Sequence, residues 1–320
     1  MTATERSTAD NTLQEILRGL GQSPRILPAK LFYDEDGSAL FDAITRLDAY
    51  YPTRCEIRIM EQHGEAVARL VGPDALLVEF GSGSSLKTRY LLDSLRAIDH
   101  TPCAYVPVDI SAEHLERSAE ALRRLHPDVP VLPLAADYTQ PLHLPEPPRP
   151  PRRTVAYYPG STIGNFHPPE AADFLARIRS LVGPDGALLI GVDLHKDTDV
   201  IEHAYNDPDG TTAAFNLNML HRLNREFATD FDLDQWRHLA FFDDEHQRIE
   251  MHLESLIDQR VSLGQHAFDF RAGETIRTEC SYKYTLERFQ KLALQAGFHV
   301  QDVFTDASGW FSVQYLTTNA

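Results

Sequence analysis

Apolar runs and helical periodicities alternate along the middle of the chain. From about residue 60 to residue 195, short apolar runs typical of strands are separated by stretches in which apolar residues recur every three or four positions. Strands spaced by helices predict an α/β fold with a parallel sheet and crossover helices on both faces. The predicted strands are Ala75–Phe80, Ala104–Val108, Val131–Ala135, Thr154–Tyr158 and Ala187–Val192, and the predicted helices are Leu86–Ile98, Ala112–Leu125 and Pro169–Leu181.

The pattern changes after the fifth predicted strand. The next helical stretch is Ala213–Phe227, and strand-like runs follow it. In Gln247–Leu253 apolar and polar residues alternate, which predicts a strand with one buried and one exposed face. A further helix is predicted at Thr285–Ala296, with Thr285 as its N-cap. The strand-like runs of this region are Arg237–Phe242, Gln247–Ile257, Arg260–Phe270, Val300–Phe304 and Phe311–Leu316.

This order of elements predicts that the chain leaves the sheet domain, builds a second α+β lobe and then returns. Residues 1–60 do not follow the alternating pattern, and we expect them to form the N-terminal part of the second lobe. The predicted segments are residues 1–60 in the second lobe, 61–195 in the sheet domain, 196–281 as the inserted lobe, and 282–320 as a helix and strand pair that complete the sheet.

A glycine-containing turn follows the first predicted strand. Residues 77–87 read LVEFGSGSSLK, with Glu79 near the strand end and Gly81 and Gly83 in the turn. Glycines let the backbone turn sharply and let a ligand approach closely, and the start of the next helix offers unpaired N–H groups. A dinucleotide fingerprint would need a third glycine where Leu86 stands. The loop therefore fits S-adenosylmethionine, as held by class I methyltransferases, better than a pyrophosphate.

Acidic residues lie at the ends of the predicted strands. Glu79 closes the first strand, Asp109 the second, and Asp137 follows the third. Ligands of such sheets bind beyond the carboxyl ends of the strands, so these acids are candidate ligand-binding residues. An acid at the end of the second strand can accept hydrogen bonds from two ribose hydroxyls. Taken singly, each could also be an ordinary acid at the end of a strand.

Composition narrows the function classes. The formal net charge is −17, from 30 Lys+Arg against 47 Asp+Glu, and it disfavours nucleic acid as a partner. The three cysteines are widely scattered, which predicts reduced thiols and a cytoplasmic location. The N-terminal stretch is acidic, so we expect no signal peptide. The chain contains no run of eighteen apolar residues, so we expect no membrane span. The fourteen histidines show no ligand spacing, so we expect no metal.

Five further strings carry a family resemblance: Leu31–Asp34, Tyr50–Glu56, Gly160–Asn165, Ala204–Asp207 and Thr278–Ser281. Together with the glycine loop, they resemble the histidine Nα-methyltransferases of ergothioneine biosynthesis, in order from about residue 25 to residue 320. The resemblance implies a Rossmann-like class I methyltransferase sheet with a second, α+β substrate-binding lobe. It also implies stepwise transfer of three methyl groups from S-adenosyl-L-methionine to the α-amine of L-histidine.

The resemblance also implies roles for individual residues. Cofactor-binding residues would be Tyr33, Gly81, Lys87, Asp109, Asp137 and Tyr138, the last standing where Phe is expected. Substrate-binding residues would be Asn165 and Tyr205 for the α-carboxylate, Glu279 and Ser281 for the imidazole, and Met251 against the ring. Catalytic residues would be Tyr33 and one of Tyr50 and Tyr51, facing the amine. The sequence leaves open which of these two tyrosines faces the substrate.

The chemistry fits these residue types. Methyl transfer from a sulfonium is an in-line displacement whose rate comes mainly from alignment. A carboxylate such as Glu279 forms a charge-assisted bond to an imidazole N–H, worth roughly 1.5–3 kcal/mol. The product is a quaternary ammonium, and the aromatic faces of Tyr33 and Tyr51 suit such a cation. For the protons that the amine must lose, we expect water reached through a tyrosine hydroxyl.

Three alternatives remain open at this stage. The same fold and chemistry could act on another amino acid such as tryptophan, although Glu279 argues against an indole. The chain could bind S-adenosylmethionine without catalysis. A nucleic-acid or protein methyltransferase is disfavoured by the negative charge and by residues suited to a free α-carboxylate. We expect a monomer that binds a small amino acid, with no nucleic-acid or membrane partner.

Overall fold

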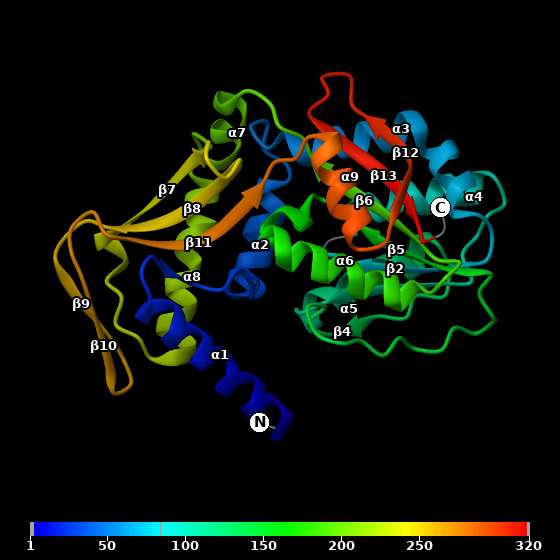
Figure 1. Ribbon diagram of the computed structural model, residues 1–320. Coiled ribbons are helices and arrows are strands. Elements are labelled where there is room, and N and C mark those ends of the chain that lie inside the picture. The colour runs from blue at the N-terminus through cyan, green and yellow to red at the C-terminus, as the bar shows by residue number, and fades with distance from the viewer. Residues whose placement is uncertain (1–2, 84, 319–320) are drawn as a thin grey trace. The chain divides into compact units, whose positions relative to one another are not determined.

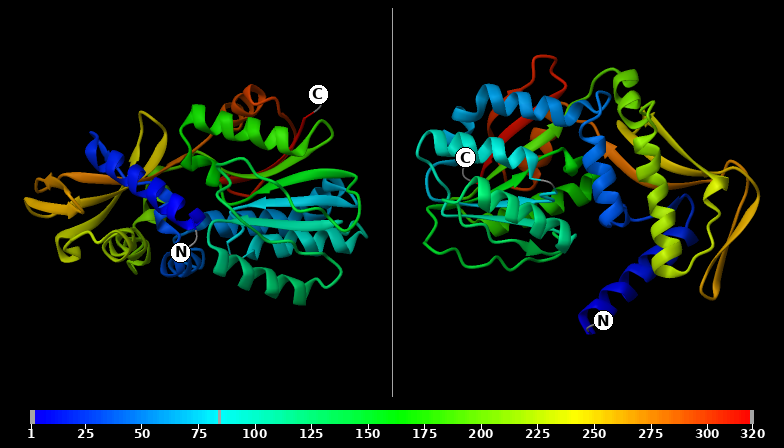
Figure 2. Two further views of the ribbon diagram at one scale, coloured as in Figure 1. Left: turned by 90° about the horizontal axis from the view of Figure 1, so that it is seen from below. Right: turned by 180° about the vertical axis from the view of Figure 1, so that it is seen from behind.

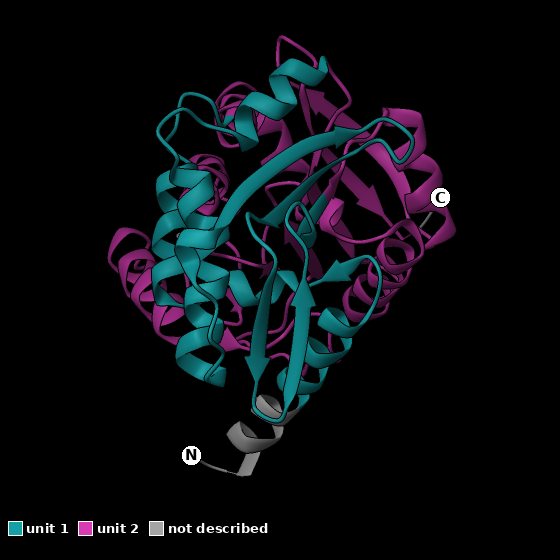
Figure 3. Ribbon diagram, turned by 90° about the vertical axis from the view of Figure 1, so that its left-hand side faces the viewer, with its two compact units in different colours: residues 1–50, 197–280 teal, residues 51–196, 281–320 magenta. Residues whose placement is uncertain are grey.

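The computed structural model describes residues 3–83 and 85–318 (Figure 1). The chain divides into two compact units: unit 1 comprises Met1–Tyr50 and Asp197–Cys280, and unit 2 comprises Tyr51–Lys196 and Ser281–Ala320 (Figure 3). The boundary expected at residue 60 falls inside one long helix, α3 (Tyr51–Val71), which belongs to unit 2. Among the described residues, no helix combines the length and apolarity needed to cross a membrane.

In the described part of the chain, unit 2 is built on a seven-stranded sheet with the strand order β12-β13-β6-β5-β2-β3-β4. Strands β2 to β6 pair in parallel, whereas β13 runs antiparallel to both β6 and β12. This topology confirms the predicted class I methyltransferase fold. The strands are β2 (Ala75–Phe80), β3 (Ala104–Asp109), β4 (Leu134–Ala135), β5 (Arg153–Tyr158), β6 (Ala187–Asp193), β12 (His299–Thr305) and β13 (Phe311–Thr317).

Helices cover both faces of this sheet. Figure 2 shows α3, α4 (Leu86–Ala97) and α5 (Ala112–Leu125) on one face, and α6 (Pro168–Val182) and α9 (Leu286–Gln295) on the other. Each helix buries an apolar stripe against the strands, which is why their sequences read at helical period. Thr285 caps α9 as predicted, because its side chain accepts a hydrogen bond from the Arg288 N–H.

The parallel order brings five strand ends to one edge of the sheet. Asp109 and Asp193 are the last residues of β3 and β6. Gly81, Asp137 and Gly160 follow shortly after the ends of β2, β4 and β5. Residues far apart in the sequence therefore face one region of unit 2, where ligands of open parallel sheets bind.

Unit 1 holds a four-stranded sheet in the order β1-β11-β8-β7, with a separate β9–β10 hairpin. Its strands are β1 (Arg25–Ile26), β7 (Trp236–Asp243), β8 (Arg248–Ser255), β9 (Gln259–Leu263), β10 (His266–Phe270) and β11 (Thr275–Tyr282). Its helices are α1 (Ala3–Gly21), α2 (Glu35–Ile44), α7 (Thr198–Tyr205) and α8 (Thr211–Phe227), with short 3-10 turns η1 (Ala29–Phe32) and η3 (Leu233–Gln235). Unit 1 thus contains both helices and mainly antiparallel strands.

Two local predictions for unit 1 are wrong. The run Arg260–Phe270 is a hairpin that turns at Gly264, whose φ of +60° suits glycine. Strand β8 is buried on both faces, because the polar side chains of its second face form an ion-pair cluster instead of facing water. In that cluster the Glu250 carboxylate pairs with Arg248 and with His252 at 2.8 Å. Strand β11, which carries Glu279, was not predicted, because Thr278 interrupts the alternation of Ile276, Cys280 and Tyr282 with polar residues.

Candidate functional site

The glycine loop of unit 2 joins β2 to α4. Gly81 and Gly83 have φ of +67° and +47°, the left-handed region in which glycine is favoured. The Gly81 N–H donates to the Val108 carbonyl at 2.8 Å, and the Gly83 N–H donates to Asp109 Oδ2 at 3.2 Å. The loop is therefore fastened to the end of β3 and passes close to the sheet edge.

Asp109 ends β3 with a half-buried carboxylate. Its oxygens accept hydrogen bonds from the backbone N–H groups of Gly83, at 3.2 Å, and Ser111, at 3.0 Å. A carboxylate has about four lone-pair positions, and within the described part of the chain the N–H groups of Gly83 and Ser111 use two of those at Asp109. Asp109 can therefore accept hydrogen bonds from a pair of adjacent hydroxyls while it still supports the loop.

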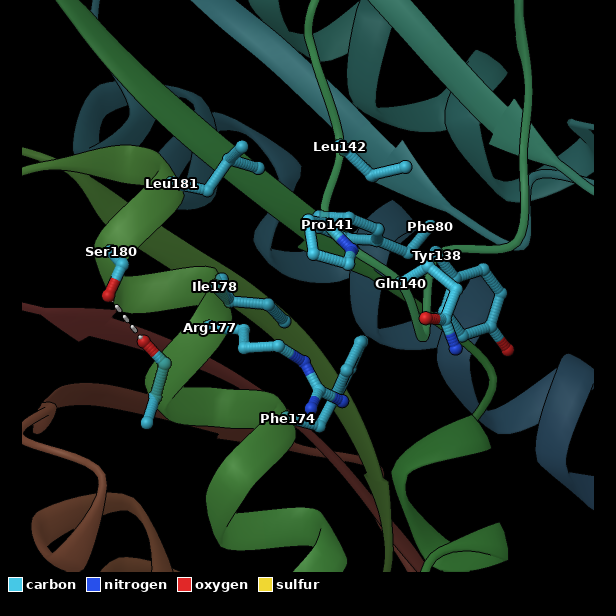
Figure 4. Close-up of a pocket in the computed structure, with 11 residues that line it drawn as sticks. Phe80, Tyr138, Gln140, Pro141, Leu142, Phe174, Arg177, Ile178, Ser180 and Leu181 are labelled. Atoms are coloured by element: carbon cyan, nitrogen blue, oxygen red, sulfur yellow. Dashed lines mark hydrogen bonds between the residues drawn. The ribbon is translucent and has the colours of Figure 1, made fainter.

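Asp137 and Tyr138 follow β4 at the same edge. Asp137 Oδ1 accepts a hydrogen bond from the Thr139 N–H at 2.9 Å, and the Tyr138 ring packs edge-on against Phe80 at 6.1 Å. Tyr138, Phe80 and Phe174 of α6 pack against one another and line a mostly apolar cavity of about 480 Å³ (Figure 4). Gly81, Lys87 and Asp109 do not line this cavity, so it marks only the aromatic end of the sheet edge.

Lys87, in the first turn of α4, is held by a buried carboxylate. Its ammonium lies 2.8 Å from Glu56 Oε2, and Glu56, on α3, is fully buried. The same carboxylate accepts a hydrogen bond from the Gly160 N–H at 2.9 Å. Glu56 thus joins the helix after the glycine loop to the loop after β5.

Glu79, near the end of β2 and just before the glycine loop, is buried and hydrogen-bonded within unit 2. Its carboxylate is buried and accepts hydrogen bonds from the hydroxyls of Thr88 and Tyr105, the latter at 2.5 Å. Burial, opposed by these two hydrogen bonds, raises the pKa of Glu79 to about 7. Glu79 therefore anchors the first turn of α4 to strands β2 and β3.

A second buried charge cluster lies at the end of β6. Asp193 Oδ2 accepts a hydrogen bond from the Tyr51 hydroxyl at 2.8 Å and pairs with the Lys283 ammonium at 2.8 Å. Lys196 pairs with the other carboxylate oxygen and donates to the Tyr51 hydroxyl at 2.9 Å. Burial lowers the pKa of Lys196, while that of Asp193 is lowered by the two ammonium groups against the effect of its burial.

The loop after β5 carries Asn165 and packs against Ser281. It contains the 3-10 turn η2 (Thr162–Asn165), and the Ser161 hydroxyl accepts a hydrogen bond from the Asp193 N–H at 2.8 Å. A Cβ placed on Gly164 would lie 2.8 Å from the Tyr282 carbonyl oxygen and 3.0 Å from Ser281 Oγ, and because the first is a backbone atom this position requires glycine. Asn165 and Ser281, predicted to bind different ends of one substrate, thus belong to neighbouring segments of unit 2.

Comparison with known proteins shows where this chain belongs. Residues 12–318 match the family described as histidine-specific methyltransferase, SAM-dependent. The chain belongs to this family. The histidine N-alpha-methyltransferase of Mycobacterium tuberculosis is 41% identical over 302 residues, which cover 94% of this chain and 92% of that protein. The predicted family is confirmed.

Two further relatives show the range of the family. Ergothioneine biosynthesis protein 1 of Neurospora crassa is 34% identical over 86% of this chain and 31% of its own length. The 4-dimethylallyltryptophan N-methyltransferase of Claviceps purpurea is 28% identical over 93% of this chain and 92% of its own length. N-methylation is common to the names of the bacterial and the Claviceps relatives.

S-adenosyl-L-methionine is the methyl donor of this family, and the sheet edge of unit 2 offers groups that fit it. Asp109 has lone pairs for ribose hydroxyls, and Tyr138 offers an aromatic face for an adenine. The hydroxyl of Ser82 in the glycine loop is buried, and among the described residues it has no hydrogen-bond partner. Within the same described part, no group of three or more His, Cys, Asp or Glu could hold a metal ion.

Unit 1 holds the other predicted site residues. Tyr33 follows η1, and its ring lies 5.9 Å from Phe41, which in turn lies 6.3 Å from Tyr50. These rings form one aromatic cluster with Phe32 and Phe215. Tyr50 thus packs in unit 1, whereas Tyr51 begins α3 in unit 2 and directs its hydroxyl to Asp193.

Tyr205, Met251 and Glu279 lie on three elements of unit 1 that one buried side chain connects. Asn216 of α8 donates to His238 Nδ1 at 2.9 Å, and His238 Nε2 donates to the Tyr205 carbonyl at 2.8 Å. The Thr278 hydroxyl, beside Glu279 in β11, bonds Asn216 Oδ1 at 2.7 Å and the Met251 carbonyl at 3.1 Å. Burial lowers the pKa of His238, which suits its neutral, two-partner arrangement.

Three buried charged residues that contact predicted site residues were not predicted from the sequence: Asp193, Lys283 and Glu56. Asp193 follows the fifth predicted strand directly, so the rule that selected Asp109 could have selected it as well. Lys283 stands between two tyrosines, and a lysine inside an aromatic run is a signal for a buried ion pair. Glu56 shares the apolar stripe of α3 with Ile59 and Met60, at helical spacing.

Proposed function

We propose that this protein transfers three methyl groups from S-adenosyl-L-methionine to the α-amine of L-histidine and forms trimethylhistidine (hercynine) for ergothioneine biosynthesis. The observation that carries the proposal is the pair Glu279 and Ser281, two positions apart in β11 and so on one face of the strand. Neutral imidazole has one N–H donor and one acceptor nitrogen, which a carboxylate and a hydroxyl complement. The 41% identity to a protein named histidine N-alpha-methyltransferase supports the same substrate.

The bound cofactor supplies a methyl group on a positively charged sulfur. For the ribose hydroxyls we propose Asp109, whose remaining lone pairs suit two donors. Asp137 and Tyr138 would frame the adenine, with the Tyr138 ring against its face. The remaining proposed cofactor-binding residues are Tyr33, Gly81 and Lys87.

The amino-acid substrate is proposed to be held through its two polar ends. Asn165 and Tyr205 would bind the α-carboxylate, and Met251 would lie against the imidazole. Unit 1 contributes Tyr205, Met251 and Glu279, so we propose that it is the substrate-binding lobe. The aromatic cluster around Tyr33 suits the cationic product, because aromatic faces attract quaternary ammonium groups.

Of the two consecutive tyrosines, we propose that Tyr51 serves the amine. Its hydroxyl is fixed by hydrogen bonds with Asp193 and Lys196, whereas the Tyr50 ring packs against Phe41. The amine must lose a proton before each transfer, and we propose that it leaves through water reached by the hydroxyls of Tyr33 and Tyr51. Near-normal turnover by Tyr33→Phe and Tyr51→Phe would contradict this route.

A second candidate is the same reaction on a tryptophan-type amine, which the Claviceps relative favours. An indole has a donor N–H but no acceptor nitrogen, so it would leave the Ser281 hydroxyl without a matching partner. Glu279→Ala is expected to weaken the binding of histidine far more than the binding of tryptophan. Equal losses for both amino acids would contradict the assignment of the imidazole to Glu279.

The decisive experiment is mass spectrometry of the small-molecule products. Purified protein is incubated with S-adenosyl-L-methionine and an equimolar mixture of the twenty amino acids, with Asp109→Ala as a variant of the cofactor-binding edge. We expect histidine alone to gain up to three methyl groups, and Asp109→Ala to lose most of this activity. Cofactor binding without any methylated amino acid would contradict the assignment of histidine as the substrate. It would favour a protein that binds S-adenosyl-L-methionine without catalysis.

We further propose that the protein acts as a monomer in the cytoplasm, without a nucleic-acid partner. Its three cysteines are free and buried, which suits a reducing compartment, and its charge of −17 opposes phosphate backbones. Light scattering coupled to size exclusion would test the monomer, because a dimer would elute with twice the mass of 36.1 kDa.

A further inference from the structure

Lys283 follows β11 as a lysine with almost no access to water. Its side chain is 1% exposed, and the neighbouring Tyr282 and Tyr284 are buried as well. A buried ammonium is costly unless charged and polar groups surround it. The partners of Lys283 include Asp193 Oδ2 at 2.8 Å and Ser281 Oγ at 3.0 Å, which meet this requirement.

The contact with Ser281 fixes the direction of one hydrogen bond. An ammonium can only donate, so the Ser281 oxygen must act as the acceptor towards Lys283. A hydroxyl carries one hydrogen of its own, and with an ammonium on its lone pair this hydrogen points elsewhere. Ser281 is 4% exposed, and no acceptor for its hydrogen is recorded among the described residues. The serine is therefore prepared to donate to a group that the protein does not supply.

Asp193 holds Lys283 in place and shares its carboxylate with a second lysine. Lys196 is buried to a similar degree, with 3% of its side chain exposed, and pairs with the other oxygen of Asp193. Its remaining partners are the Tyr51 hydroxyl and the Leu194 carbonyl, and no contact with Ser281 is recorded. The two lysines are thus both buried and share one counter-ion, but of the two only Lys283 contacts the serine.

We propose that Lys283 is a specificity-determining positioning residue, which makes the Ser281 hydroxyl an obligatory donor and thereby selects a side chain with an unprotonated ring nitrogen. This inference rests on the proposed function, in which Ser281 faces the imidazole. Neutral histidine supplies such a nitrogen, whereas indole, phenyl and thiophene rings do not. Lys283 itself does not contact the substrate and acts only through Ser281.

The test measures binding of two amino acids to the protein saturated with S-adenosylhomocysteine. L-histidine and β-(2-thienyl)-L-alanine have rings of similar size, but thiophene has neither the donor nor the acceptor of imidazole. Calorimetry gives the ratio of their dissociation constants for the wild type, Ser281→Ala, Lys283→Met and the double variant. Lys196→Met is the matched control, since it removes an ammonium from the same carboxylate without touching Ser281.

We expect the preference for histidine to fall about tenfold in Ser281→Ala, the value of one neutral hydrogen bond, and by a similar factor in Lys283→Met. The double variant should lose no more than either single variant, because both remove one interaction. Lys196→Met should keep the wild-type ratio. A Lys283→Met protein that keeps the full preference while Ser281→Ala loses it would overturn the inference, as would additive losses.

Two outcomes separate this inference from the proposed function. A wild-type protein that does not bind histidine refutes the proposed function itself, whatever the variants do. If Lys283→Met does not fold, Lys283→Arg and Lys283→Gln replace it, since a guanidinium can only donate whereas an amide can also accept. Lys283→Arg should then keep the preference and Lys283→Gln should lose part of it; equal ratios for both would overturn the inference.

Discussion

Replacing Asp193 by asparagine tests the charge cluster at the end of β6. The side chain of Asp193 is 1% exposed and faces two ammonium groups and the Tyr51 hydroxyl. Asparagine keeps the volume and an acceptor oxygen but leaves Lys196 and Lys283 without a counter-ion. Removal of one partner from a buried ion pair costs about 3–5 kcal/mol, and two orphaned lysines place Asp193→Asn at about 5 kcal/mol of unfolding free energy at pH 7.

The same substitution predicts a particular pH dependence. Burial already lowers the pKa of Lys196, and Asp193 opposes this effect, so the pKa falls further when the carboxylate is lost. Between that lowered value and about 10.4, the ordinary pKa of lysine, the unfolded chain binds more protons than the folded one. Stability therefore rises with pH in this window, and the defect of Asp193→Asn should shrink between pH 7 and pH 10.

Urea unfolding followed by far-UV circular dichroism measures both effects. The matched control is Glu65→Gln, which breaks the exposed Glu65–Arg69 pair on α3 and should cost less than about 0.5 kcal/mol at either pH. A loss below about 1 kcal/mol for Asp193→Asn at pH 7 would contradict the buried ion pairs. A loss of the predicted size that stays constant up to pH 10 would show that the lysines are not its cause.

Three further predictions concern the supports of the site. Glu79 has a folded-state pKa of about 7, above its ordinary 4.5, so the folded state binds the extra proton and the wild type should lose roughly 3 kcal/mol of stability as pH rises from 4.5 to 8. Glu79→Gln should lack this loss, and parallel wild-type and variant curves of unfolding free energy against pH would contradict it. Glu56→Gln keeps an acceptor for the Gly160 N–H but removes the counter-ion of Lys87. It should weaken the binding of S-adenosyl-L-methionine about tenfold, as measured by calorimetry. An unchanged dissociation constant would show that Lys87 does not need Glu56. Asn216→Ala leaves the Thr278 hydroxyl without one of its buried partners and should cost about 2–3 kcal/mol in urea unfolding, whereas a neutral effect would show that water replaces the amide.

The elements of unit 2 could be predicted closely because their patterns are local. Strand β2 and helix α5 have the predicted bounds, since apolar runs of strand length and apolar residues at helical spacing arise within one element. The glycine loop could also be predicted from local sequence, because glycine adopts positive φ values such as that of Gly81 without strain. Asp109 could be selected from the sequence because the carboxyl ends of parallel strands share one edge.

Unit 1 was harder to predict because its strands do not follow a simple pattern. In β8 the polar residues that suggested an exposed face are buried in ion pairs around Glu250, whose pKa falls to about 2 against the effect of its burial, chiefly because His252 and two arginines surround it. In strand β11, which carries Glu279 and Ser281, Thr278 interrupts the apolar alternation that would have predicted a strand. Partners from distant parts of the chain, which no local pattern records, decide the burial of such polar residues.

The sequence by itself determined the sheet, the glycine loop and the family. Only the tertiary structure decided how the charges of unit 2 are paired: Asp193 meets Tyr51 across 142 positions of the chain, and Gly160 meets Glu56 across 104. A turn or a helix depends on the residues next to it, so its signal is written locally. A buried charge is stable only beside an opposite charge, and the packing of distant segments decides which one it meets.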